Sequence, residues 1–260
     1  MAELRAIVDD LEANDGDLEE AVARYERGVA LQRHAETQLQ AARLRVEELL
    51  PDGTTAVLND EERTMTDEGI ALRAVGADSL LARLEGPADL RSLTDPQLVE
   101  LAEQIRTAII ATTSVTGGHL GPSLGVVELT IALHRVMNSP VDRIVFDTGH
   151  QAYPHKLLTG RLARFGTLRQ LGGIGGFPRR TESPHDVFDG GHAGTGISIG
   201  QGLALARDVR GGDEKVAVVV GDAALMSGLS LEALNDIGHR GTPLLIVLND
   251  NEMSISPTVG

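Results

Sequence analysis

The sequence has 260 residues, of which 42% are hydrophobic, and it carries a formal net charge of -15 without a single cysteine. The missing cysteines exclude disulfides, thiolate nucleophiles and cysteine-based zinc sites, and they are compatible with the cytoplasm. An acidic chain without clusters of Lys and Arg argues against direct binding to nucleic acid. No apolar run reaches the roughly 18 residues that span a membrane, and the N-terminus does not resemble a signal peptide, so we expect a soluble, cytoplasmic protein.

Apolar residues recur at three- and four-residue steps between Ala2 and Leu50, interrupted by a polar turn at Asn14, Asp15 and Gly16. This pattern predicts two helices that form an antiparallel hairpin or a short coiled coil within residues 1–52. Such a hairpin can pack on its own protein, on a second copy, or on a different protein, and periodicity does not decide between these. Residues 53–78 are polar and without sustained periodicity, which predicts a linker.

Three short motifs lie in this first region. Residues 11–13 are Leu-Glu-Ala, residues 16–21 are Gly-Asp-Leu-Glu-Glu-Ala and residues 25–28 are Tyr-Glu-Arg-Gly. They resemble the exodeoxyribonuclease VII small subunit. The resemblance implies a non-catalytic helical partner that binds the exodeoxyribonuclease VII large subunit through residues 2–50. Because acidic residues outnumber basic ones in residues 1–52, binding to protein is favoured over direct binding to DNA.

Helical and strand patterns alternate over residues 79–260. Helices are predicted at residues 96–113, 126–137, 195–207 and 229–239, and strands at residues 143–147, 215–220 and 244–248. The alternation predicts an α/β domain with a parallel sheet that helices cover on both faces. Ligands of such sheets gather at the carboxyl ends of the strands, so the chemistry is expected directly after them.

Two of these strand ends carry oxygen-bearing side chains. Asp222 follows strand 215–220, and Asn251 follows strand 244–248, 29 positions later. Magnesium prefers octahedral oxygen ligands and shares them with substrate phosphates. Each strand end alone could be a turn or a helix cap, but the two together favour Mg²⁺ held against a diphosphate by Asp222, Asn251 and a nearby backbone carbonyl.

Further motifs lie at residues 117–121 (Gly-Gly-His-Leu-Gly), residues 147–156 (Asp-Thr-Gly-His-Gln-Ala-Tyr-Pro-His-Lys) and residues 191–193 (Gly-His-Ala). Together with Asp222 and Asn251, which match the thiamine-diphosphate motif, they resemble the 1-deoxy-D-xylulose-5-phosphate synthase family. The resemblance implies a transketolase-like, homodimeric transferase that uses thiamine diphosphate and Mg²⁺. It implies the condensation of pyruvate with D-glyceraldehyde 3-phosphate, with loss of carbon dioxide, to a precursor of isoprenoids and thiamine.

The resemblance also implies roles for single residues. His119 is the catalytic candidate, for proton transfer or for orienting substrate. The implied metal ligands are Asp222, Asn251 and the carbonyl of Met253. The implied cofactor contacts are His150, Gly191, His192, Ala193, Ala223, Ala224 and Asn251, the two alanines at positions 223 and 224 through their backbone. Family residues that activate the aminopyrimidine and bind substrate phosphate fall after position 260, so only the anchoring part of the site is expected here.

One position departs from the family pattern, because Ala223 stands where the thiamine-diphosphate motif has its second glycine. A methyl group there is expected to crowd the diphosphate or to strain a backbone that needs positive φ. We therefore expect cofactor binding to be weakened without being abolished.

Other suggestive residues have plainer explanations. Gly194, Gly196 and Gly200 echo a dinucleotide-binding fingerprint, yet their spacing differs and no apolar strand directly precedes them, so close helix packing is predicted. Outside the motifs, we interpret His34, His134 and His239 as loop or core residues. The roles of His155 and His185 stay open.

Three hypotheses about the whole chain stay open. In the first, the synthase-like region is the working part. In the second, the N-terminal hairpin acts as a nuclease subunit and the remainder is a passenger. In the third, a genomic accident or a gene-calling error joined the two parts, with Met65 as a separate start.

Overall fold

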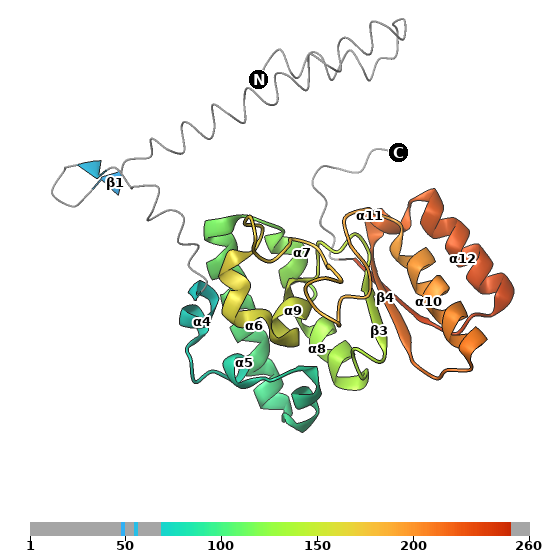
Figure 1. Ribbon diagram of the computed structural model, residues 1–260, viewed down its shortest axis with the longest axis horizontal. Coiled ribbons are helices and arrows are strands. Elements are labelled where there is room, and N and C mark those ends of the chain that lie inside the picture. The colour runs from blue at the N-terminus through green and yellow to red at the C-terminus, as the bar shows by residue number, and fades with distance from the viewer. Residues whose placement is uncertain (1–47, 50–54, 57–68, 251–260) are drawn as a thin grey trace, which may run out of the picture. The chain divides into compact units, whose positions relative to one another are not determined.

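The computed structural model describes residues 48–49, 55–56 and 69–250 (Figure 1), and the chain divides into two units, Met1–Met65 and Thr66–Gly260. In the first unit β1 (Glu48–Leu49) pairs antiparallel with β2 (Thr55–Ala56). The predicted helix to Leu50 is therefore wrong at its last residues. Pro51 disfavours a helical conformation at the residue before it, and Asp52 and Gly53 favour a turn between paired strands. The rest of the predicted hairpin lies outside the described residues.

A parallel sheet forms the centre of the second unit. Its strands β3 (Arg143–Phe146), β4 (Val216–Gly221) and β5 (Leu245–Asn249) lie in the order β3-β4-β5. Phe146 pairs with Val219, which pairs in turn with Val247. Branched side chains dominate β4 because they suit a strand that is buried on both faces. The predicted α/β class and the three predicted strands are confirmed.

Helices cover both faces of this sheet (Figure 1). One face contributes Ile144, Phe146, Ala217 and Val219 to a cluster with Leu133 of α8 (Val127–Val136). The opposite face contributes Val145, Val218 and Val220 to a cluster with Ile197 of α10 (Gly196–Arg210) and Ala233 of α12 (Gly228–Arg240). Successive strand residues point to opposite faces, which is why one strand serves both clusters.

A second apolar core surrounds the long helix α6 (Asp95–Thr116), where Leu101, Ile105 and Ile109 recur every four residues and are all fully buried. Thr94 starts this helix as a capping box with Gln97. The shorter helical elements are α5 (Leu80–Arg83), η1 (Pro87–Ser92), α7 (Leu120–Leu124), α9 (Tyr153–Lys156), η2 (Leu157–Arg161), η3 (Leu162–Thr167) and α11 (Asp222–Leu225). Among the residues that the structure describes, no helix has both the length and the apolar character of a membrane crossing.

The predicted linker at residues 53–78 extends too far toward the C-terminus. Residues Ile70–Val75 form helix α4, whose Ala71 is fully buried and whose Leu72 and Val75 pack against the core around α6. A helix of six residues shows less than two turns of periodicity, so its pattern was too short to be recognised in the sequence. The folded part of the second unit therefore includes α4.

Candidate active site

The carboxyl ends of the three strands bring together several of the predicted site segments. Gly221 at the end of β4 pairs with Asn249 at the end of β5, and Asp222 follows as the first residue of α11. Among the described residues, no group of three or more His, Asp or Glu side chains could hold a metal ion by itself. Asn251 and Met253 lie outside the described residues, so the metal site stays a prediction.

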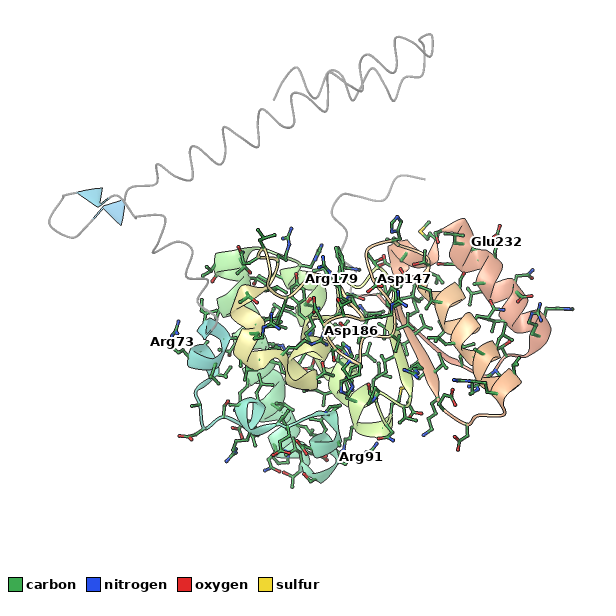
Figure 2. The ribbon with its side chains drawn as sticks, viewed as in Figure 1. Arg73, Arg91, Asp147, Arg179, Asp186 and Glu232 are labelled. Carbon is green, nitrogen blue, oxygen red and sulfur yellow. The ribbon has the colours of Figure 1, made fainter. Side chains whose placement is uncertain are left out.

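Asp147 follows β3 directly and is almost completely buried, at 2% exposure. Its two carboxylate oxygens accept hydrogen bonds from the amides of Gly194 (2.8 Å) and Gly196 (2.7 Å), and the Thr148 hydroxyl donates a third at 3.0 Å. The segment 191–193 is thereby tied to the end of β3. Figure 2 shows Asp147 at the edge of the sheet where α10 and β4 meet the connecting loops.

The glycines around Asp147 are explained by close packing, as predicted. A Cβ atom on Gly196 would stand 2.8 Å from the Asp147 side chain, and one on Gly200 would overlap Val218 of β4. Gly194 also has a φ of +79°, which non-glycine residues rarely adopt. A side chain at Gly200 would push α10 away from β4, whereas one at Gly196 would displace Asp147 and one at Gly194 would displace Ser227.

His119 and His150 lie together, with ring centroids 5.7 Å apart in an edge-to-face arrangement. His119 precedes α7, and its ring also lies 5.6 Å from that of Phe177. Its backbone amide donates to the Tyr153 hydroxyl at 3.2 Å. The Ser123 hydroxyl donates to the carbonyl of His150 at 3.1 Å. His119, the predicted catalytic residue, and His150, a predicted cofactor contact, therefore lie side by side.

The surroundings of both histidines favour the neutral imidazole. Burial lowers the pKa of His119, and the nearby positive charge of Arg169 lowers it further. Burial also lowers the pKa of His150; His119 adds to the effect and Asp147 opposes it. The Nδ1 atom of each ring is buried without a hydrogen-bond partner in the described structure. Since buried polar atoms are almost always paired, these two nitrogens fit a site that a polar ligand completes.

Strained backbone marks the same place. Thr148 (φ +60°) and Arg169 (φ +62°) are the non-glycine residues with positive φ in the described part of the chain. Thr148 precedes Gly149 and His150, and the charge of Arg169 acts on His119. Left-handed conformations of this kind cost energy and collect at functional sites.

The predicted diphosphate contacts lie on α11. Ala223 has an ordinary helical conformation there and is exposed, so the expected strain of a positive φ is absent and that expectation was wrong. The reason is that the chain turns into a helix directly after Asp222, where alanine is favoured. Ala224 is buried, and its carbonyl accepts a hydrogen bond from Ser230 at 2.8 Å. Gly191, His192 and Ala193 are exposed.

Four residues of this site had no role in the sequence interpretation, namely Asp147, Tyr153, Arg169 and Phe177. The first two belong to the motif at residues 147–156, so their presence was visible while their contacts were not. Phe177 is one of only four phenylalanines in the chain, which is the single sequence signal it offered. Arg169 carried no signal, because its position beside His119 depends on the fold of the segment after η3.

Comparison with known proteins adds the family to this geometry. The family model described as 1-deoxy-D-xylulose-5-phosphate synthase matches residues 81–260. The chain belongs to this family. The 1-deoxy-D-xylulose-5-phosphate synthase of Syntrophotalea carbinolica is 60% identical over 182 residues, which are 70% of this chain and 29% of that protein. The chain thus spans less than a third of the length of the curated relatives it matches.

Other relatives agree. Synthase 2 of Geobacter sulfurreducens is 59% identical over 181 residues, covering 70% of this chain and 29% of that protein. The synthase of Geobacillus thermodenitrificans is 53% identical over 180 residues, covering 69% of this chain and 29% of that protein. A second family model, described as the exonuclease VII small subunit, matches residues 1–48. Both resemblances that the motifs carried are confirmed.

Proposed function

We propose that residues 79–260 anchor thiamine diphosphate through Mg²⁺, as the cofactor-binding part of a 1-deoxy-D-xylulose-5-phosphate synthase. The reaction joins pyruvate to D-glyceraldehyde 3-phosphate and releases carbon dioxide. The observation that carries the proposal is the pair of half-buried histidines, His119 and His150, whose buried Nδ1 atoms have no partner, in a chain that belongs to this family. A homodimer stays an expectation from the family.

The proposed metal ligands are the Asp222 carboxylate, the Asn251 side chain and the Met253 carbonyl. Asp222 starts α11 at the carboxyl end of β4, beside the end of β5 from which Asn251 continues. Magnesium retains waters and binds phosphate oxygens beside a few protein ligands, so one carboxylate suits a diphosphate. The proposed cofactor contacts are His150, Gly191, His192, Ala193, Asn251 and the backbone of Ala223 and Ala224.

Bound thiamine diphosphate supplies the electron sink for the decarboxylation. Burial lowers the pKa of His119 and so favours the neutral imidazole, which can accept a proton at one nitrogen while the other donates one. Phe177 and Tyr153 limit the movement of its ring. Arg169 places a positive charge near this ring, which favours a substrate with a carboxylate or phosphate group.

The test is calorimetric titration of the purified chain with thiamine diphosphate, with and without Mg²⁺. We expect Mg²⁺-dependent binding that weakens about tenfold or more in Asp222→Asn. Asp213→Asn is the matched control, because this carboxylate is exposed in the loop before β4, at the opposite end of that strand, and should leave affinity unchanged. Wild-type affinity in Asp222→Asn would remove Asp222 from the metal site, and no binding by the wild-type chain would overturn the proposed function.

A second candidate function belongs to residues 2–50, and the match of residues 1–48 to the exonuclease VII small subunit favours it. The chain would then bind an exonuclease VII large subunit without itself acting on DNA. Co-purification with a large subunit of the same organism tests this. Capture by the full chain, and not by a chain that lacks residues 1–52, supports it, whereas equal failure of both overturns it.

A further inference from the structure

Three segments to which the proposed function assigns the cofactor come from separate places in the chain. His150 follows β3, the segment 191–193 precedes α10, and Ala224 lies in α11 after β4. Segment 191–193 is exposed. Its position relative to the other two segments must therefore be fixed by contacts of the residues that follow it in the chain.

Asp147 supplies one of these connections. Its carboxylate has no cationic partner among the described residues, and its charge is instead satisfied by the amides of Gly194 and Gly196 and by the hydroxyl of Thr148. Each carboxylate oxygen accepts from a different amide. The backbone from Gly194 to Gly196 is therefore held at two points and cannot pivot about a single hydrogen bond. This connection joins the segment after β3, which contains His150, to the segment before α10.

Ser230 supplies the second connection. It lies in the first turn of α12 and is fully buried. Its hydroxyl oxygen is 2.8 Å from the carbonyl oxygen of Ala224 and 3.2 Å from that of Gly194, and the Ser227 hydroxyl donates to it at 3.0 Å. One hydroxyl proton serves one acceptor at a time, so Ser230 shares its proton between the two carbonyls. This connection joins α11 to the segment before α10.

Gly194 is the junction of both connections. Its amide is held by Asp147 and its carbonyl faces Ser230, so the two peptide groups that flank it are both fixed. A Cβ atom here would overlap the Ser227 hydroxyl, which leaves room only for glycine. A shift of one of the three segments would therefore break a hydrogen bond that ties it to the others.

We propose that Asp147 and Ser230 are positioning residues, which lock the three cofactor-binding segments in register through the backbone of Gly194. The effect of this locking on cofactor affinity rests on the proposed function. A segment already held in its binding conformation loses less conformational freedom when the ligand arrives, so binding is tighter.

The first measurement is amide hydrogen exchange on the ligand-free chain. In Ser230→Ala and in Asp147→Asn, the amides of Gly194 and Gly196 should exchange about tenfold faster, because a local opening now breaks fewer hydrogen bonds. Exchange in β4 should stay as in the wild type. Ser198→Ala is the matched control. This serine of α10 is exposed, so its substitution should change neither the exchange of the Gly194 and Gly196 amides nor that of β4. Ser230→Ala keeps the test available if the buried Asp147→Asn variant does not fold.

The second measurement is the affinity of the same variants for thiamine diphosphate in the presence of Mg²⁺. Faster exchange at Gly194 together with about tenfold weaker binding supports the proposal. Unchanged exchange in Ser230→Ala overturns it. Faster exchange with unchanged affinity overturns the positioning role while the proposed function stands. Absence of binding in the wild-type chain overturns the proposed function and the positioning role with it.

Discussion

Two polar regions of the second unit differ in how completely their buried atoms are paired. The charge cluster consists of His155, Lys156, Arg161, Glu182 and Asp186. Asp186, labelled inside the molecule in Figure 2, accepts from both terminal nitrogens of Arg161 (2.7 and 2.9 Å), from His155 (3.0 Å) and from the amide of Arg179 (2.8 Å). Glu182 accepts from Lys156 and from the amide of Gly175, both at 2.6 Å.

The candidate site presents the opposite situation, because His119 and His150 each keep a buried Nδ1 without a partner. Breaking a buried ion pair leaves an uncompensated charge and is strongly destabilising. A buried polar atom without a partner costs stability unless a ligand completes it. The charge cluster therefore supports the structure, whereas the histidine pair is the place where we propose that a ligand binds.

The charge cluster also explains how the site is held. Residues 168–195 contain no helix or strand, yet they carry Phe177 and the segment 191–193. Glu182 and Asp186 attach this long segment to Lys156, His155 and Arg161 of the helical layer. The charge cluster thereby holds in place the segment that carries Phe177 and residues 191–193.

The largest expected effect comes from breaking the charge cluster. Asp186→Asn should lower the free energy of unfolding by about 3–5 kcal/mol, because the buried Arg161 loses its nearest counter-charge and keeps only Glu182 at 3.5 Å. Urea denaturation followed by circular dichroism measures this. Asp189→Asn is the control: its carboxylate pairs with Arg180 at the exposed surface, so stability should hardly change. Equal effects of the two variants would contradict the structural role of the cluster.

The next effect is a loss of stability in acid. Burial lowers the pKa of His155 to about 4 in the folded chain, against about 6.5 when unfolded. Between these values only the unfolded chain takes up the proton, so stability that is complete above pH 6.5 is lost as the pH falls. The free energy of unfolding should fall by about 1.4 kcal/mol per pH unit, or about 3 kcal/mol down to pH 4. A flat profile in denaturation at pH 7, 6 and 5 would contradict a buried, neutral His155.

A smaller effect is expected at the histidine pair, His119 and His150. Tyr153→Phe removes the hydroxyl that accepts from the His119 amide, which should cost about 1 kcal/mol of unfolding free energy. The His119 ring resonances should shift in NMR spectra, whereas those of His134 should not. Unchanged resonances of His119 would show that Tyr153 does not position it.

The smallest effect is electrostatic. Arg169→Gln should raise the pKa of His119, because the positive charge that opposes protonation is removed. NMR titration of the imidazole measures the shift. Arg164→Gln, at another exposed arginine, serves as the control. A lowered pKa of His119 in Arg169→Gln would have the wrong sign and would contradict the arrangement.

Much of the sheet could be predicted because its pattern is local. The apolar run of β4 and the helical stripe of α6 depend on residues that are neighbours in the chain. His134 was interpreted as a loop or core residue, and it is fully buried, with its Nε2 atom 2.8 Å from Nδ1 of His155. Helix α4 was missed because six residues carry too little periodicity.

The sequence by itself determined the alternation of strands and helices, the family motifs, and the residue types that can hold a metal or move a proton. These follow from side-chain chemistry and from short spacings. Only the tertiary structure decided that His119 lies against His150, that His155 belongs to the charge cluster, and that Asp147 holds Gly194. Such pairs are far apart in the chain and meet only after the core has packed, which no local pattern encodes.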